Sequence, residues 1–169
     1  DLTGLVKAGC TTMNSMFRSY GVITSTNTTG WDTSTVTDMA LLGNLGNINN
    51  GASINGIIGD ENWNTQRVTT FSSAFRTQSG AFNVGLWNTS SVITLANAWA
   101  DNTSPSLALY DVTFWDVSKV VSMSGTFYNS FYYAGPFNVS LWNTASLMDA
   151  TNLFALSDIG WPISSAPAF

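Results

Sequence analysis

Side chains able to do acid–base or nucleophilic chemistry are scarce in this 169-residue sequence. There is no histidine, so the imidazole base and the commonest zinc ligand are both missing. The one glutamate, Glu61, follows Asp60; neighbours on a strand point to opposite faces, which makes them a poor pair for glycoside hydrolysis. No acidic segment has the closely alternating oxygen ligands of a calcium loop. We therefore predict a protein that is not an enzyme, with no catalytic residue, metal site or cofactor.

The single cysteine, Cys10, occupies a position that holds valine or leucine in every later copy of a repeat described below. A small buried hydrophobic side chain is the expectation for such a cysteine, rather than a reactive thiol. One cysteine allows no internal disulfide, so packing and backbone pairing must hold the fold together.

The composition is unusually poor in charge. Charged residues make up 9% of the chain and the net charge is −5, against roughly 25% charged residues in an ordinary domain. The five basic residues are scattered, whereas nucleic-acid binding requires clustered Lys and Arg. We expect no nucleic-acid partner, and a surface that is either neutral and hydrated or partly covered by other proteins.

No apolar run approaches the roughly 18 to 20 residues that span a bilayer, so no membrane-spanning segment is expected. The sequence begins at Asp1 rather than Met, which fits a processed or truncated product.

One phrase recurs along the chain, and it begins with tryptophan in five of six copies. We count positions in each copy from its first residue, position 0. Apolar residues recur at positions 5, 8 and 12, with Gly43 as the exception at position 12. The copies begin at Leu5, Trp31, Trp63, Trp87, Trp115 and Trp142. Intervals of this length indicate a repeat protein, and we expect residues 1–169 to form a single repeat domain.

The pattern within a copy predicts its local structure. Before the Trp, three copies alternate apolar residues, as in Phe82, Val84 and Leu86, which is typical of a strand with one buried face. After it, the spacing of positions 5, 8 and 12 matches one helical stripe, and Ser34, Ser90 and Ser118 could cap such a helix. We predict an α/β solenoid: a leucine-rich-repeat-like stack of about six strand–turn–short-helix units with one parallel sheet.

The phrase WDVSKVVSMSGTFYNS, with PFNVSLWNT after it, resembles the WDVSxVTxMxxMF repeats of the BspA-like leucine-rich-repeat surface proteins. The resemblance extends roughly from Leu5 to Phe154. It implies a secreted or surface-displayed solenoid that binds partners, and it does not imply catalysis. The sequence departs from this family at Leu5, at Gly43 and in the stretch Gly43–Asp60.

Asn or Asp follows each of the five copy-initial Trp residues and also stands four residues before most of them, where these side chains can satisfy turning backbone. Sugar or cation binding by these residues is the alternative, although most are uncharged. Four Asn-X-Ser/Thr sequons occur, at Asn27, Asn88, Asn102 and Asn138. Only Asn102 lies in a variable loop, so we expect it to be the glycosylation acceptor if the chain enters a glycosylating pathway.

Variable loops are where repeat proteins usually carry specificity. The loop Tyr128–Pro136 contains four aromatic residues that could anchor a protein partner or cover the end of the helix row: Tyr128, Phe131, Tyr132 and Tyr133. The stretch Gly43–Asp60 is rich in Gly and Asn and is expected to bulge, with Ile57 and Ile58 starting the strand before Trp63.

Three functions fit these observations. The first is a non-enzymatic interaction, structural or adhesion module of a secreted or surface protein. The second is an extrinsic subunit of a large membrane complex, such as an algal photosynthetic assembly, processed in an organelle. The third is a carbohydrate-binding adhesin, which would need exposed Trp or Tyr rings. The expected partners are therefore other proteins, in an assembly or a matrix, and possible glycans.

Overall fold

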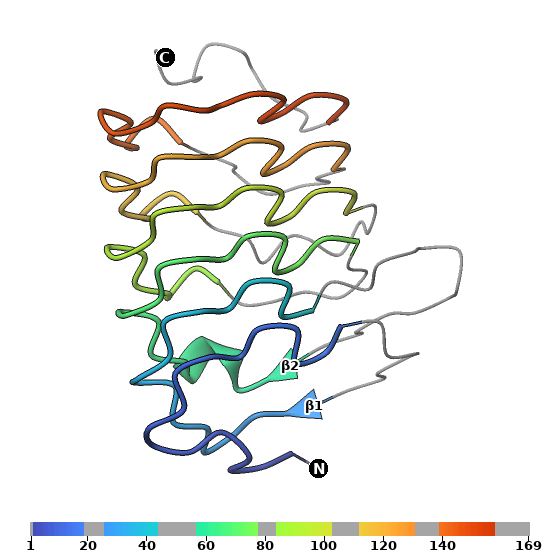
Figure 1. Cartoon of the computed structure of the whole chain (residues 1–169), viewed down its shortest axis with the longest axis vertical. Helices are drawn as coiled ribbons and strands as arrows, with labels where there is room; N and C mark the ends of the chain where they lie inside the picture. The colour runs from blue at the N-terminus through green and yellow to red at the C-terminus, as the bar shows by residue number, and fades with distance from the viewer. Residues whose placement is uncertain are drawn as a thin grey trace.

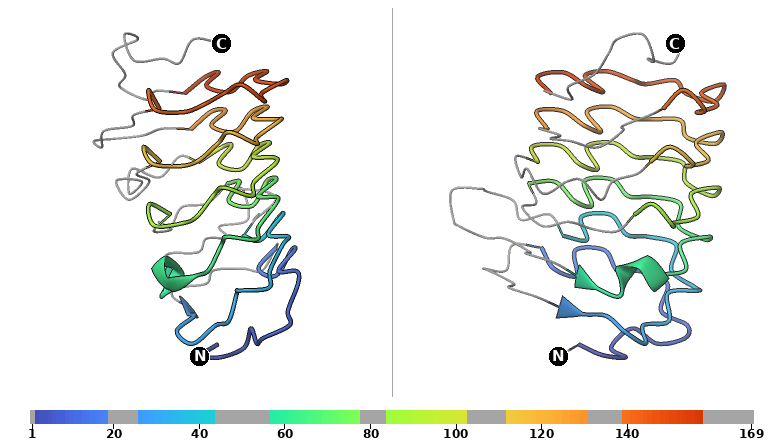
Figure 2. Two further views of the ribbon diagram at one scale, coloured as in Figure 1. Left: turned by 90° about the vertical axis from the view of Figure 1, so that its left-hand side faces the viewer. Right: turned by 180° about the vertical axis from the view of Figure 1, so that it is seen from behind.

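The computed structural model describes residues 2–18, 26–43, 57–77, 84–102, 112–130 and 139–157, which are parts of all six copies. These segments lie one above another, from copy 1 at the bottom of Figure 1 to copy 6 at the top. The side and rear views in Figure 2 show the same order. Each copy is thus one irregular coil of a stack.

Backbone hydrogen bonds join successive coils in register. The N–H groups of positions 8, 10, 12 and 14 donate to the carbonyls of positions 7, 9, 11 and 13 in the next copy. In copy 4, for example, Leu95 donates to Ser122 O at 2.9 Å, and Trp99 donates to Thr126 O at 2.9 Å. In the opposite direction, the position-6 N–H donates to position 6 of the copy before, as Val121 does to Ile93 O at 2.8 Å. This alternation is that of a parallel strand ladder.

Regular strands are nevertheless very short. The strand β1 (Thr26–Asn27) pairs in parallel with β2 (Ile57–Ile58), and a 3₁₀ turn, η2 (Asp60–Asn62), follows β2. The expected strand start at Ile57 and Ile58 is confirmed. Elsewhere in the described segments, parallel pairing is reduced to one isolated bridge per pair of copies, at position 7: Thr12, Asp38, Thr70, Thr94, Ser122 and Asp149.

The predicted strand–turn–short-helix unit is wrong, and so is the single continuous sheet. The described residues contain no α-helix and one two-stranded sheet. Positions 8 to 13 instead form two overlapping turns, each closed by a bond between residues three apart, as in Ala98 N–H to Leu95 O and Ala100 N–H to Asn97 O. Ser34, Ser90 and Ser118 consequently cap no helix.

Left-handed backbone is the physical reason that no helix forms. Position 10 has positive φ in all six copies, including Leu41 (56°), Ser73 (52°) and Gly125 (58°). Position 14 repeats this in Thr77, Asp101, Asn129 and Leu156. A positive φ at the third residue is the geometry of a type II turn, and it interrupts right-handed helix every four residues. Turns of this spacing bury positions 8 and 12 as a helix would.

The strand alternation predicted before Trp87, Trp115 and Trp142 is also wrong in the part of these stretches that the structure describes. Val84 is buried, whereas Leu86, two residues later, is 76% exposed. The Trp87 N–H donates to Val84 O at 3.1 Å, so a tight turn brings the chain round between them. Equivalent turns are closed by the Trp115 N–H donating to Val112 O and by the Trp142 N–H donating to Val139 O. The residue directly before each of these three Trp residues is thereby turned outward.

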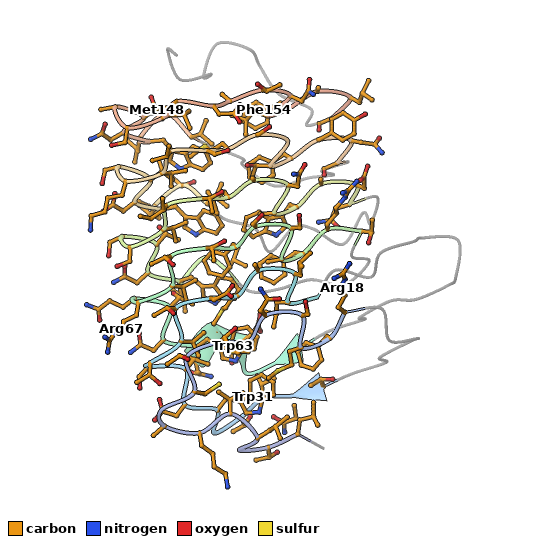
Figure 3. The ribbon with its side chains drawn as sticks, viewed as in Figure 1. Arg18, Trp31, Trp63, Arg67, Met148 and Phe154 are labelled. Atoms are coloured by element: carbon orange, nitrogen blue, oxygen red, sulfur yellow. The ribbon has the colours of Figure 1, made fainter. Side chains whose placement is uncertain are left out.

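Two aromatic columns form the core. Every copy-initial Trp is at most 7% exposed, and Figure 3 shows Trp31 and Trp63 inside the stack. The rings of Trp31 and Trp63 lie 5.7 Å apart, and those of Trp63 and Trp87 lie 5.8 Å apart. A second column at position 12 joins Phe75, Trp99, Phe127 and Phe154 at spacings of 5.1, 5.8 and 5.6 Å. The stretch 44–56 of the expected bulge lies outside the described residues.

Candidate interaction surfaces

The few acidic and thiol side chains do not assemble into a reactive site in the described segments. Asp60 is buried, and Glu61 accepts a bond from the Asn62 amide at 3.1 Å. Cys10 is half-buried and its thiol donates to Thr12 O at 3.3 Å. No group of three potential metal ligands occurs among the described residues.

The Asn/Asp position after each Trp turns the chain, as its chemistry suggested. In all five copies its side-chain oxygen accepts the backbone N–H two residues on, at 3.0 or 3.1 Å. Hydrogen bonds from Ser34 lower the pKa of Asp32, and those from Ser118 lower the pKa of Asp116. In both pairs the serine hydroxyl has the larger effect and the backbone N–H the smaller one. These side chains are therefore occupied by backbone, which leaves them little capacity to hold a cation or sugar. Of the residues expected four places before a Trp, Asn27 makes the same turn to Thr29 at 2.9 Å.

Sequence reasoning missed a second polar column, at position 7. Its oxygen accepts the N–H of position 9 in each copy, as in Asp149 to Thr151 at 3.0 Å and Thr94 to Ala96 at 3.2 Å. The backbone N–H of Thr151, more than any other group, lowers the pKa of Asp149. The signal was available in the sequence, because all six copies carry Thr, Ser or Asp there.

An exposed apolar column runs over the last three copies at the position before each Trp. Leu86 is 76% exposed, Phe114 79% and Leu141 66%. The copies are in register here, because the Trp115 indole donates to Val84 O at 3.1 Å and the Trp142 indole to Val112 O at 3.0 Å. Single exposed apolar residues need no explanation, but a row of three on adjacent rungs indicates a binding surface. We call Leu86, Phe114 and Leu141 the outer apolar column.

Position 6 provides a second row of exposed apolar residues in the same three copies, namely Ile93, Val121 and Met148. In the first three copies this position holds threonine. The apolar character of the surface is thus concentrated in copies 4 to 6, on two rows.

The predicted aromatic partner site is described only at Tyr128, because Phe131, Tyr132 and Tyr133 lie outside the described residues. Tyr128 is half-buried, and its carbonyl accepts the N–H of Asp101 at 2.8 Å. Asp101 in turn pairs with Arg76 at 2.9 Å and accepts the Asn129 amide at 3.0 Å. Tyr128 therefore belongs to an edge held by polar contacts between copies 3, 4 and 5.

The structure does not favour Asn102 as a glycosylation acceptor. Asn102 is fully buried, and its N–H donates to the Ser130 hydroxyl at 3.4 Å. Ser130 is buried as well and donates to Trp99 O at 2.6 Å. A glycan requires an exposed amide, so the burial of Asn102 at position 15 of its copy counts against that expectation.

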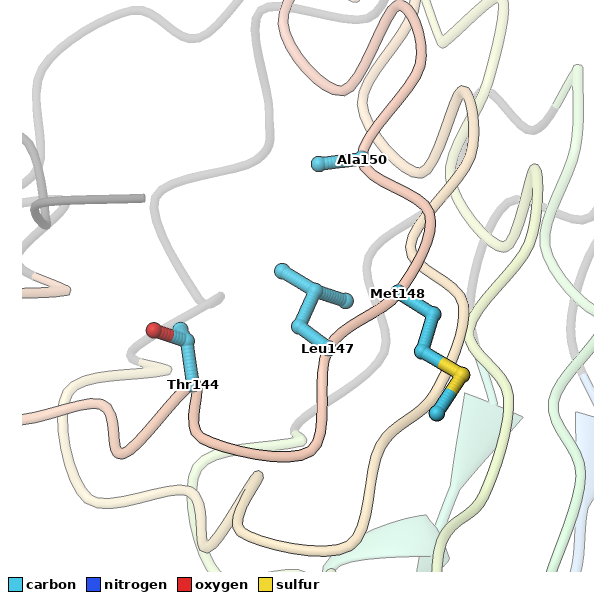
Figure 4. Close-up of a pocket in the computed structure, with 4 residues that line it drawn as sticks. All are labelled: Thr144, Leu147, Met148 and Ala150. Atoms are coloured by element: carbon cyan, nitrogen blue, oxygen red, sulfur yellow. The ribbon is translucent and has the colours of Figure 1, made fainter.

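The C-terminal end of the stack carries an open hollow of about 220 Å³ lined by Thr144, Leu147, Met148 and Ala150. Figure 4 shows Leu147 and Ala150 directed into the same space. Leu147 and Ala150 are only partly buried, whereas the same positions are fully buried in copies 2 to 5. Among the described residues, which end at 157, no copy beyond copy 6 lies over these positions.

Comparison with family models identifies the family to which the chain belongs. Residues 11–50 and 43–159 match the family described as "Mycoplasma protein of unknown function, DUF285", so the chain belongs to that family. No curated protein and no solved structure matches it. Among the described residues, no helix is long and apolar enough to cross a membrane.

Proposed function

We propose that this chain is a non-enzymatic protein-interaction module of a secreted or surface protein, in line with its resemblance to BspA-like surface proteins. The observation that carries the proposal is the outer apolar column. Three large side chains, each more than 60% exposed, follow one another on adjacent rungs of a surface that is nearly devoid of charge. Apolar side chains ringed by polar ones are the usual centre of a protein–protein contact.

The core of the stack is fixed by backbone bonds and buried aromatics, so it presents these side chains on a rigid frame. Preorganised side chains lose little entropy on binding, which favours affinity from a small contact. The partner would therefore offer an apolar patch long enough to follow three rungs. With parallel spacing of about 4.8 Å, three rungs span roughly 10 Å.

The burial of the tryptophans counts against the carbohydrate-adhesin alternative. Sugar stacking needs an accessible ring face, and every copy-initial Trp is at most 7% exposed. Of the large exposed apolar residues in the described segments, Phe114 alone is aromatic. The extrinsic-subunit alternative uses the same outer apolar column and differs in that its partner would be permanent.

A photoreactive phenylalanine analogue at Phe114 tests the proposal. In native material it should give a discrete crosslinked protein, and Leu86→Ser with Leu141→Ser should reduce that product without changing the melting temperature. The analogue at exposed Lys119 is the matched control on the same rung. Equal products from both sites, or none from Phe114, would contradict the proposal. A partner that co-purifies with the chain even without crosslinking would favour the extrinsic-subunit alternative.

A further inference from the structure

Asn88 is an exposed asparagine that begins an Asn-Thr-Ser sequence, at position 1 of copy 4. Asn-X-Ser/Thr is the sequence that accepts N-linked glycans, and a glycan needs an asparagine at the surface. Of the other sequons, Asn102 is fully buried, Asn27 is half-buried in β1, and Asn138 lies outside the described residues. Within the part of the chain that the structure describes, Asn88 is therefore the one exposed sequon asparagine.

The side chain of Asn88 uses its oxygen in the turn and leaves its nitrogen unused. The oxygen accepts the Ser90 N–H at 3.0 Å and the Ser90 hydroxyl at 2.7 Å. The amide nitrogen carries two donors but makes no hydrogen bond to any described residue. The Asn88 backbone carbonyl also accepts the Thr65 hydroxyl at 3.0 Å, which joins this turn to copy 3. A glycan on the amide nitrogen would leave all three bonds in place, so the modified copy could keep its register.

The other Trp-led copies lack one half of this arrangement. Copies 2 and 5 have serine two residues on but aspartate at position 1, and copies 3 and 6 have asparagine at position 1 but no hydroxyl two residues on. The turn itself is the same in each case. Asp116 accepts the Ser118 N–H at 3.0 Å, and Asn143 accepts the Ala145 N–H at 3.1 Å. Single substitutions copied from these neighbours can therefore remove or add an acceptor without changing the turn.

We propose that Asn88 carries an N-linked glycan when the chain is secreted. The inference rests on the proposed function only for the secretory route. In the transfer, Asn88 Nδ2 loses one proton and forms a bond to the anomeric carbon of an oligosaccharide held on a polyprenyl pyrophosphate. The bond from that carbon to the phosphate oxygen breaks, and the polyprenyl pyrophosphate leaves with the electron pair.

Burial decides which acceptors the folded chain can tolerate. Transfer takes place on the extended chain, so a sequon can be modified before its surroundings form. The finished stack has room for a glycan at exposed Asn88 and none at fully buried Asn102. A glycan would also add hydrated surface to a chain in which only 9% of residues are charged.

Site mapping on secreted protein tests the inference. The chain is fused to a cleavable secretion signal and produced in a eukaryotic cell line, so that the glycosylating pathway is supplied whatever the native destination of the chain. The folded, secreted protein should carry a glycan at residue 88 and none at residue 102, as measured by mass spectrometry of its peptides before and after enzymatic release of N-glycans. Folded protein that is unmodified at residue 88, or modified at residue 102 instead, would overturn the inference.

Variants copied from the neighbouring copies complete the test. Asn88→Asp keeps the accepting oxygen and removes the nitrogen, and Ser90→Ala keeps the backbone bond and removes the hydroxyl. Both should lose the glycan at residue 88, and both should melt as the native chain does when made without glycans in bacteria. Asp116→Asn should gain a glycan at residue 116, because Ser118 is already in place. A glycan that persists at residue 88 in Ser90→Ala, or none at residue 116 in Asp116→Asn, would contradict the inference. Neither result bears on the outer apolar column, which crosslinking at Phe114 tests separately.

Discussion

The indole N–H groups explain how the tryptophans are buried without loss of a hydrogen bond. Trp87, Trp115 and Trp142 each donate to the carbonyl three residues before the first residue of the preceding copy, at 3.0 or 3.1 Å. Trp31 reaches Leu2 O in the same way, and Trp63 reaches the Thr28 hydroxyl. A buried donor without a partner would cost about 1–3 kcal/mol. Trp at position 0 therefore fixes the register of its copy on the one before.

At the residue scale, Phe127→Ala and Phe114→Ala form a matched pair. Phe127 is fully buried between Trp99 and Phe154, whereas Phe114 is 79% exposed. We expect Phe127→Ala to lower the free energy of unfolding by about 3–5 kcal/mol and Phe114→Ala to change it by less than about 0.5 kcal/mol. Urea denaturation measures both. Similar midpoints for the two variants would show that position 12 is not core.

Acid should weaken the turns at position 1. The Ser118 hydroxyl and N–H hold the pKa of Asp116 below its ordinary value in the folded chain. The unfolded chain therefore binds the proton more readily, and this stability is complete above the ordinary aspartate pKa of about 3.9 and lost as pH falls below it. Asp116→Asn keeps the accepting oxygen, as Asn64, Asn88 and Asn143 do, and removes the titration. The melting temperature of this variant should fall less than that of the native chain between pH 6 and pH 3.

An equal fall in the melting temperatures of the native chain and Asp116→Asn over this pH range would contradict the explanation. The effect is expected to be small, because Asp116 is exposed and water screens it.

At the scale of the element, the sequence predicted which positions are buried but not the backbone that buries them. Positions 5, 8 and 12 are core in copies 2 to 5, as the spacing indicated. The helix failed because position 10 holds Ser, Leu, Asn or Gly, and only Gly125 signals a positive φ. Leu41 adopts φ 56° because the backbone bonds of its copy to the next fix it. A single copy could not reveal this, since the conformation depends on its neighbours.

The left-handed column makes Gly125 sensitive to substitution. A Cβ there would lie 2.5 Å from the Asn97 amide oxygen at the same position of the preceding copy. The positive φ of 58° adds a conformational penalty. We expect Gly125→Ala to cost about 1–3 kcal/mol, measured by urea denaturation, with part of that cost recovered in an Asn97→Ala background. Full additivity of the two substitutions would show that the contact is not the cause.

At the scale of the whole molecule, the repeats could be predicted from the sequence, whereas the side chains that lie on the surface could not. The copies follow one another in chain order and are joined by backbone bonds at matching positions. The outer apolar column was expected to lie inside a sheet, because Leu86, Phe114 and Leu141 fit a strand alternation; the turn that closes on each Trp places them outside. Asn102 was assigned to a loop because the end of a copy carries no strong signal, and it proved to be interior.

Amide hydrogen exchange tests most directly that the coils are joined rung to rung without helices. The N–H groups of positions 8, 10, 12 and 14 should be protected in the inner copies, as in Leu95, Asn97 and Trp99. Exchange should be faster at position 9, as in Ala96, because its N–H bonds only to a side-chain oxygen of its own copy. Continuous protection from position 5 to position 14 would indicate a helix and contradict the stack.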